Sequence, residues 1–252
     1  MISFEFPVTE RVRLLLRLED LFARLDHHLS AGAALDHHAA LLTLFDLAEL
    51  GGRVDIKGEL LQELERQKQL LDTLRDNPAI SETALESLLA EIDQAQRQLL
   101  RQASRLGHSI RENEWLSSIR QRAMLAGGVS RFELPAYHSW LSLPDEARAA
   151  DLAGWIAPVL PAREGTRILL ELLRRSGKTF ELVARGGQFQ QMSGGRSVHL
   201  LRVTLEAGTD AVPELSANKY AINVRFIQAR PRRGRALPVT ADIPFTLTHC
   251  RF

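Results

Sequence analysis

The residue types that could carry covalent or metal chemistry are few in this chain of 252 residues. Cys250 is the only cysteine and stands next to the C-terminal end, which disfavours a Cys–His nucleophile. An aspartate followed by two histidines occurs twice, at residues 26–28 and 36–38. Adjacent residues on a helix project about 100° apart, so each pair offers only one ligand to any one face. We therefore expect no metal ion and no catalytic residue.

The glycines do not form a phosphate-binding loop. The stretches at residues 51–58 and 185–196 lack both the spacing and the strand–loop–helix setting that such loops need. We therefore expect no cofactor and no enzymatic activity. The N-terminal stretch is charged and lacks the apolar core of a signal peptide, and no apolar run is long enough to span a membrane. A single cysteine is also typical of a reducing compartment, so the sequence predicts a cytoplasmic protein.

Positive charge is the remaining functional signal, and it first gathers near the N-terminus. Arg13, Arg17 and Arg24 lie along one edge of a predicted helix. Like charges at such spacing destabilise a helix by about 0.2–0.5 kcal/mol per pair, a cost that a bound anion would offset. Glu10 and Asp20, however, lie within three or four residues of these arginines. Anion binding and pairing within the helix therefore both remain open.

A second basic group follows in the middle of the chain. Arg120 and Arg122 end a predicted helix, Arg131 comes soon after, and His138 lies between Tyr137 and Trp140. These basic residues fit either a solvated helix end or part of a partner surface. A histidine between two aromatic residues is more often a partly buried polar side chain than a binding residue.

A third basic group belongs to residues 217–226, in which side chains of two kinds alternate. Such alternation predicts a strand with one buried face, here formed by Tyr220, Ile222, Val224 and Phe226. Lys219 and Arg225 fall on the other side. Residues 216–241 contain six Lys/Arg and no acidic residue. This face could bind an anionic partner, but basic residues on an exposed strand can also serve only to prevent aggregation.

Charge also divides the chain into two halves, although the net charge of +1 indicates no polyanionic partner. Residues 1–125 carry 15 Lys/Arg and 20 Asp/Glu, and residues 126–252 carry 17 and 11, which favours two modules. The first half predicts helices, because its leucines keep helical spacing behind capping residues such as Thr9, Asp36 and Ser81. The expected helices are 9–28, 36–52, 55–77, 81–107 and 112–125, with the third and fourth as an antiparallel hairpin.

The second half predicts an antiparallel sheet, because its apolar stretches are short and turn residues separate them. We expect two helices before most of these strands to cover one face of the sheet. The fold class is therefore α+β, with an N-terminal all-α helical domain at 1–126 and a mainly antiparallel β-sheet domain with covering helices at 127–252. The expected strands are 129–135, 179–185, 188–192, 198–205, 219–226 and 243–249, and the two helices are 145–156 and 162–176.

Several separate blocks occur in an order that resembles one known family. They are FEFPVTERVRLLLRLEDLF at 4–22, GGVSRFELPAYHSWLSLP at 127–144 and LLRRSGKTFELVARGGQFQQ at 172–191, followed by LLRVTL and KYAINVRF. Together these blocks resemble the ZapD family of bacterial cell-division proteins, over nearly the whole chain.

The resemblance implies a helical domain, a β domain and a homodimer. It further implies binding to the C-terminal tail of FtsZ, the tubulin-like GTPase of the division ring, and bundling of FtsZ protofilaments with a lower FtsZ GTPase rate. Recruitment to mid-cell would then depend on FtsZ. The family uses basic residues to bind FtsZ, although Glu114 stands where the family has one of them. With the second basic group added, the expected FtsZ-binding residues are Arg13, Arg17, Arg120, Arg122, His138, Lys219 and Arg225.

Two other classes of function compete with this one. A nucleic-acid-binding module would also use basic and aromatic residues, but the near-neutral net charge and the lack of a known DNA or RNA motif count against it. A scaffold protein could use the helical hairpin at 55–106 alone, which would leave the basic strand without a role. We therefore expect FtsZ as the partner, with no nucleic acid and no insertion into a membrane.

Overall fold

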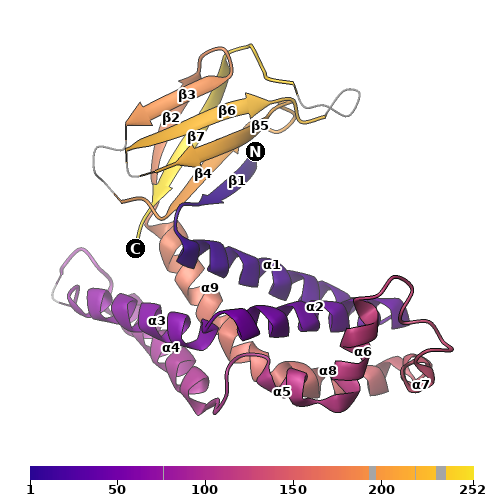
Figure 1. Ribbon diagram of the computed structural model, residues 1–252. Helices are drawn as coiled ribbons and strands as arrows, with labels where there is room; N and C mark the ends of the chain where they lie inside the picture. Colours follow the sequence, from indigo (N-terminus) through magenta and orange to yellow (C-terminus); the bar gives the residue numbers. More distant parts are fainter. Residues whose placement is uncertain (76, 193–196, 219, 231–236) are drawn as a thin grey trace. The chain divides into compact units, whose positions relative to one another are not determined.

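The computed structural model describes residues 1–75, 77–192, 197–218, 220–230 and 237–252. It has the expected α+β class, with helices in the first part of the chain and antiparallel strands in the last (Figure 1). The chain forms two compact units: a helical unit, Arg17–Leu169, and a β unit made of Met1–Leu16 and Leu170–Phe252. This division differs from the expected boundary at residue 126, because the first strand joins the β unit and several later helices join the helical unit.

The helical unit begins within α1 (Glu10–Ala31), and three of its later helices start at capping side chains. Asp55, Ser81 and Asn113 accept hydrogen bonds from N–H groups three residues on, at 3.2, 3.4 and 3.0 Å. The other elements are α2 (Ala34–Arg53), α3 (Ile56–Asp72), α4 (Glu82–Arg101), α5 (His108–Glu112), α6 (Glu114–Ala123), α7 (Pro135–Leu141), α8 (Asp145–Ile156), a 3-10 turn (Ala157–Val159) and the first part of α9 (Leu160–Arg175).

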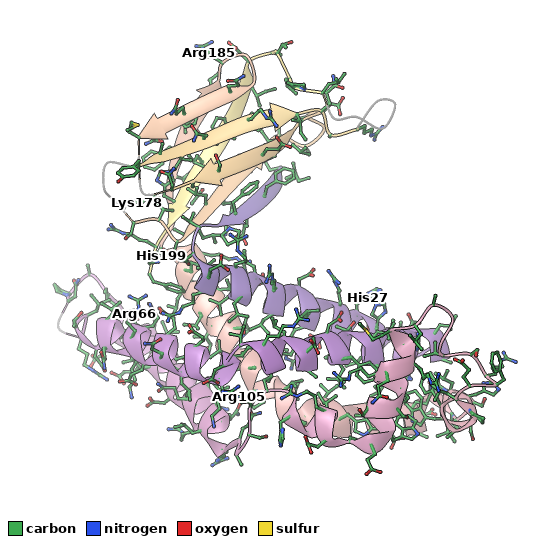
Figure 2. All side chains as sticks on the ribbon, in the orientation of Figure 1. His27, Arg66, Arg105, Lys178, Arg185 and His199 are labelled. Carbon is green, nitrogen blue, oxygen red and sulfur yellow. The ribbon has the colours of Figure 1, made fainter. Side chains whose placement is uncertain are left out.

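Helices α3 and α4 pack against each other, as predicted for the hairpin. Lys68 on α3 contacts Asp93 on α4 at 2.6 Å. Glu63 is buried on α3 and accepts hydrogen bonds from Arg66 at 2.5 Å and from Gln67 at 2.7 Å (Figure 2). A buried carboxylate needs such donors, because an unpaired charge inside a protein is strongly destabilising.

The sequence predicts helix ends at Gly51 and Gly107, but in the structure these two glycines allow close packing between segments. Gly51 lies inside α2, and a Cβ there would overlap the carbonyl oxygen of Leu106. Gly107 has φ +70° directly before α5, and a Cβ there would overlap Ala48 of α2. The helix expected to end at Gly51–Gly52 continues through both glycines and ends one residue later, at Arg53, whereas the helix expected to end at Gly107 ends at Arg101. Glycine at these places lets the segment before α5 lie directly against α2.

A buried arginine joins α8 to α2 in the helical unit. Arg148 is 6% exposed, and its Nε donates to Nδ1 of His37 at 3.0 Å. The other guanidinium nitrogens donate to backbone carbonyls of Gly32 at 3.0 Å, of Leu141 at 3.4 Å and of Leu143. Because Nδ1 of His37 accepts this hydrogen bond, the imidazole is neutral and carries its proton on Nε2.

The β unit contains two antiparallel sheets (Figure 1). Four strands form one sheet in the order β1-β4-β7-β2, and three form the other in the order β3-β6-β5. The strands are β1 (Ile2–Pro7), β2 (Lys178–Ala184), β3 (Gln188–Met192), β4 (Leu200–Leu205), β5 (Val212–Ala217), β6 (Ala221–Ile227) and β7 (Ile243–Cys250).

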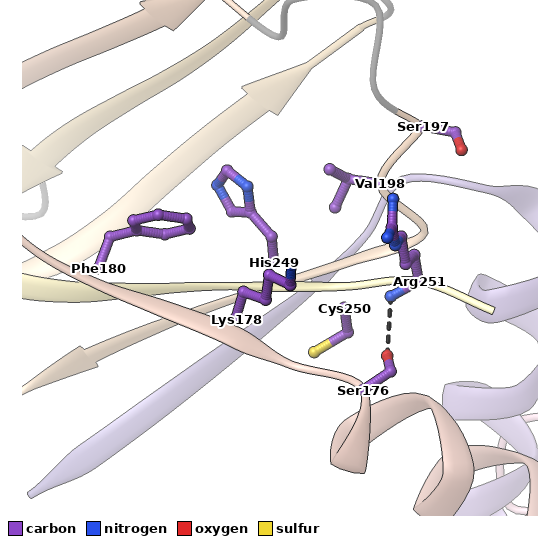
Figure 3. A pocket seen from close by; sticks show the side chains of 8 residues that line it. All are labelled: Ser176, Lys178, Phe180, Ser197, Val198, His249, Cys250 and Arg251. Atoms are coloured by element: carbon purple, nitrogen blue, oxygen red, sulfur yellow. Dashed lines mark hydrogen bonds between the residues drawn. The ribbon is translucent and has the colours of Figure 1, made fainter. Parts of the chain in front are cut away.

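One end of the four-stranded sheet is closed by helix ends. Val12 of α1 and Leu173 of α9 pack with Leu200 and Cys250. Beside this cluster, the backbone N–H of Arg251 donates to Oγ of Ser176 at 3.0 Å (Figure 3). Of the two helices expected to cover the sheet, α9 therefore contributes its last turns, whereas α8 belongs to the helical unit.

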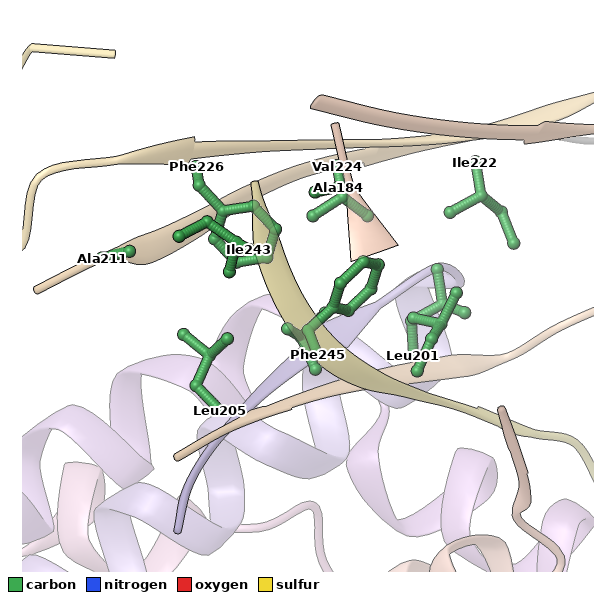
Figure 4. Packing of buried hydrophobic residues seen from close by; sticks show 11 residues of the cluster. Ala184, Leu201, Leu205, Ala211, Ile222, Val224, Phe226, Ile243 and Phe245 are labelled. Atoms are coloured by element: carbon green, nitrogen blue, oxygen red, sulfur yellow. The ribbon is translucent and has the colours of Figure 1, made fainter. Parts of the chain in front are cut away.

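The main core of the β unit lies between the two sheets. Val224 and Phe226 of β6 pack with Phe245 and Leu247 of β7 (Figure 4). The alternation expected in β6 is confirmed, with Ile222, Val224 and Phe226 buried and Asn223 and Arg225 exposed. Tyr220, in contrast, is 61% exposed, because the side chain of Asn218 accepts the N–H groups of Tyr220 and Ala221 in a turn before the strand.

Three other expectations about strands differ from the structure. The strand expected at 129–135 is wrong: the N–H groups of Glu133 and Leu134 bond the carbonyl of Ser130 in a turn, and Pro135 starts α7. Strand β1 was not expected, since its sequence reads as the approach to a capped helix. Strand β5 was not expected because it contains Pro213, which is tolerated there because β5 is an edge strand.

No helix in the described ranges is long and apolar enough to cross a membrane.

The arginine–histidine contact predicts how stability depends on pH. Burial, together with the charge of Arg148, lowers the pKa of His37 from its usual 6.5, and Asp145 and Asp36 oppose this shift. In the unfolded chain His37 therefore takes up a proton near pH 6.5, whereas in the folded protein it does so only at a lower pH. The contribution of His37 to stability is complete above this pH, and it is lost as the pH falls toward the lower folded pKa.

We expect the free energy of unfolding, measured by urea denaturation, to fall between about pH 7.5 and pH 5. His37→Asn keeps an acceptor for Arg148 and cannot be protonated, so its free energy of unfolding should fall less. Burial also lowers the pKa of His38 and His249, so part of the slope should remain. Equal slopes for the variant and the wild-type protein would show that His37 does not titrate on unfolding.

Candidate partner-binding groove

A groove of about 350 Å³ lies between α1 and α2 of the helical unit. Leu21 and Leu50 are half-buried and form its apolar floor. The four lining residues of each helix, leucine included, repeat one spacing, in steps of three, one and three residues, which places each series on one helix face. The lining residues are Arg17, Asp20, Leu21 and Arg24 of α1, and Asp46, Glu49, Leu50 and Arg53 of α2.

Most charges of the groove pair with one another. Arg24 contacts Asp20 at 2.5 Å, and Arg53 contacts Glu49 at 2.9 Å. Arg17 is exposed and forms no ion pair with any residue that the structure describes. Pairing within α1, one of the two interpretations that the sequence left open, therefore holds for Arg24, and Arg17 is left available to a ligand.

Helix α6 brings a further arginine to this groove. Nη1 of Arg120 lies 3.5 Å from Oε2 of Glu49, so that Glu49 contacts both Arg120 and Arg53. Arg120 therefore contacts Glu49, one of the residues that line the groove together with Arg17. Sequence reasoning missed Glu49, Leu50 and Arg53, although the repeated spacing on α2 could have indicated them.

An aromatic cluster holds α6, α7 and α8 together behind Arg120. The ring of Trp115 lies 5.7 Å from that of Trp140 and 5.1 Å from that of Trp155. Tyr137 packs on Trp140, and its hydroxyl lies 2.6 Å from Nδ1 of His38 on α2. Burial raises the pKa of Tyr137 and lowers that of His38, so both groups are uncharged at neutral pH. The cluster fixes α6, and therefore Arg120, against α2.

The remaining expected site residues of the first two basic groups do not line this groove. Arg13 lies in the part of α1 that belongs to the β unit; its side chain is 43% exposed, and its Nε donates to Glu10 at 3.2 Å. Arg122 lies 4.0 Å from Glu133. His138 is partly buried on α7, beside the aromatic cluster.

Arg225 belongs to the β unit. Lys219 lies outside the described residues. Arg225 lines a hollow on the outer face of the three-stranded sheet together with Gln190 and Asn223, and its Nε donates to Oε2 of Glu214 on β5 at 3.0 Å. The outer face is therefore mainly polar and amide-rich, with the charge of Arg225 balanced by Glu214.

The two Asp-His-His stretches have structural partners. His37 accepts from Arg148, His38 contacts Tyr137, and His28 lies 3.5 Å from Asp36. Among the residues that the structure describes, no group of three or more His, Cys, Asp or Glu could hold a metal ion. The groove itself offers charge-assisted hydrogen bonds at its rim and apolar contact at its floor.

Comparison with known proteins agrees with the resemblance seen in the sequence. The family model described as ZapD, cell division protein, matches residues 16–225. The chain is 52% identical to the Cell division protein ZapD of Chromobacterium violaceum over the whole length of both proteins. It is 50% identical to the protein of that name from Aromatoleum aromaticum, over 99% of this chain and 97% of the relative. The Ralstonia nicotianae protein of the same name is 47% identical over the full length of both. The chain belongs to the ZapD family of cell division proteins.

Proposed function

We propose that this protein is a non-catalytic cell-division factor that binds the C-terminal tail of FtsZ and cross-links FtsZ protofilaments. Its family membership supports a role in cell division. The observation that carries the finer proposal is the α1–α2 groove, in which Arg17 is exposed and without an ion pair among the described residues, beside an apolar floor.

An FtsZ tail is a flexible linker that ends in a short segment of apolar and acidic residues. Such a segment can place apolar side chains on Leu21 and Leu50 and a carboxylate on Arg17. Exposed ion pairs contribute only about 0–1 kcal/mol each. A carboxylate of the tail can therefore replace Asp20 at Arg24, or Glu49 at Arg53 and Arg120, at little cost in stability.

One such groove gives a weak contact and cannot cross-link filaments alone. A homodimer would present the groove twice, and a filament presents many tails, so that binding gains effective concentration. The same interaction would recruit the cytoplasmic protein to mid-cell wherever FtsZ assembles. Lateral contacts between bundled filaments would slow their turnover and lower the apparent GTPase rate of FtsZ.

Bundling is the first measurable consequence. We expect the purified protein to increase the sedimentation of FtsZ polymerised with GTP and to lower its rate of phosphate release, and we expect neither effect with FtsZ that lacks its C-terminal tail. Equal pelleting of tail-less FtsZ would contradict the proposal. Binding of a DNA oligonucleotide at the same salt concentration, with no effect on FtsZ, would support a nucleic-acid-binding module instead.

Charge reversal at the groove tests the site itself. Arg17→Glu should weaken binding of a fluorescein-labelled FtsZ tail peptide about tenfold, the loss expected for one charge-assisted hydrogen bond with added repulsion. The control is Arg97→Glu on α4, which likewise changes an exposed helical arginine without an ion pair among the described residues. Fluorescence anisotropy measures the affinities, and circular dichroism checks the fold. If both variants bind like the wild-type protein, Arg17 is only solvated.

The β unit allows a test of Arg225 that does not remove it. If Arg225 also binds the tail, Glu214 competes with the tail for the guanidinium. Glu214→Gln should then strengthen tail binding about threefold, whereas Arg225→Glu should weaken it. Both effects should shrink at high salt, because exposed charges are screened beyond about 8–10 Å at physiological ionic strength. Weaker binding by Glu214→Gln would exclude Arg225 from the site.

A further inference from the structure

A second concave site lies in the β unit, at one end of the four-stranded sheet. Its volume is about 340 Å³. Phe180 of β2, His249 of β7 and Val198 surround it, and Lys178 and Arg251 lie at its rim (Figure 3). The proposed role of the α1–α2 groove uses none of these residues.

The site exists because the inner face of the large sheet continues beyond the core. Phe180 pairs with Leu247 across β2 and β7, and residues directly opposite each other share a face of the sheet. Leu247 is fully buried in the core between the sheets, whereas Phe180 is 41% exposed. Phe180 therefore presents apolar surface in a place where its neighbour is covered.

Strand β2 also has an open edge. It is the last strand of its sheet and pairs along its length only with β7 among the described strands, apart from a single bridge between Arg185 and Gln188 at the hairpin end. Alternate N–H and C=O groups of Lys178–Val183 therefore point away from the sheet. Such an edge accepts a further strand through backbone hydrogen bonds.

The charged side chains that line the site are both basic. Lys178, at the start of β2 (Figure 2), and Arg251 form no ion pair with any described residue, and no carboxylate lines the site. The backbone of Arg251 is held by the hydrogen bond from its N–H to Oγ of Ser176, at 3.0 Å. Burial lowers the pKa of His249, so its imidazole ring, which lines the site, is uncharged at neutral pH. Two cations at the mouth of an apolar hollow complement a ligand with both an apolar and an acidic part.

We propose that this site binds an extended acidic segment of a partner protein. The segment adds a strand to the outer edge of β2, places a bulky apolar side chain against Phe180, and sets a carboxylate between Lys178 and Arg251. Backbone hydrogen bonds to the open edge of β2 contribute affinity for any extended peptide. The apolar hollow and the two basic side chains select peptides that carry both an apolar and an acidic residue. None of the residues that line this site lines the α1–α2 groove.

The test uses the full-length protein and a phage-displayed library of random octapeptides. The library is selected in parallel on the wild-type protein and on Phe180→Ser. Only the wild-type protein should enrich peptides with a bulky apolar residue flanked by Asp or Glu. An enriched peptide, synthesised with a fluorescein label, should bind Phe180→Ser and the double variant Lys178→Glu with Arg251→Glu at least about tenfold more weakly. N-methylation of alternate backbone nitrogens of the peptide should also abolish binding.

Strand β2 supplies a matched control. Val183 is 40% exposed, nearly as much as Phe180, but lies on the opposite face of the same strand. Val183→Ser should therefore bind the peptide within about twofold of the wild-type protein. Thermal melting followed by circular dichroism checks that each variant is folded, and the double variant decides the outcome if Phe180→Ser is not.

Three results would overturn the proposal. The first is that no peptide is enriched on the wild-type protein over the variants. The second is that the enriched peptides bind Phe180→Ser as well as they bind the wild-type protein. The third is that Phe180→Ser converts a dimer into a monomer in sedimentation velocity, because the edge of β2 would then be covered by a second copy of this chain and not by a peptide.

Discussion

The close approach of the segment before α5 to helix α2 is the contact on which the position of α6, and with it Arg120, depends. It requires glycine at 51 and at 107, because a Cβ at either position would overlap the backbone of the facing segment. Arg111 strengthens the contact by donating to the carbonyl groups of Leu106 and Ala48. Since α6 follows α5 directly, this contact also decides that Arg120 reaches Glu49.

The α1–α2 groove beside Arg120 is not a simple basic patch. Its arginines and carboxylates nearly balance, and each carboxylate that contacts an arginine does so at the protein surface, where ion pairs are weak. Without a ligand, the arginines of such a surface are neutralised by neighbouring carboxylates. When a ligand binds, its acidic groups can replace those carboxylates. Selectivity then comes from the apolar floor, because a ligand with charge alone gains little over Asp20 and Glu49.

The sequence predicted the α+β class, the helical hairpin and strands such as β3 and β6, because helical and alternating periodicities are local signals. Prediction from the sequence failed for residues whose role is a contact with a segment far away in the chain. Gly51 reads as a helix end, and only the position of Leu106 shows that it is a packing site. The arginines near the N-terminus were visible, but their pairing with Asp20, and the arrival of Arg120 at Glu49, depend on side-chain geometry and on which helices meet.

The central claim is that the α1–α2 groove binds the FtsZ tail, and site-specific photo-crosslinking tests it most directly. Asp46 is exposed and lines the groove without an ion pair to any described residue, so p-benzoylphenylalanine can replace it with little disturbance. After irradiation with FtsZ polymers, mass spectrometry should locate the crosslinks in the C-terminal tail of FtsZ, whereas the same probe at Arg97 should give few. Crosslinks from position 46 to the GTPase domain of FtsZ, or equal yields from both positions, would contradict the account.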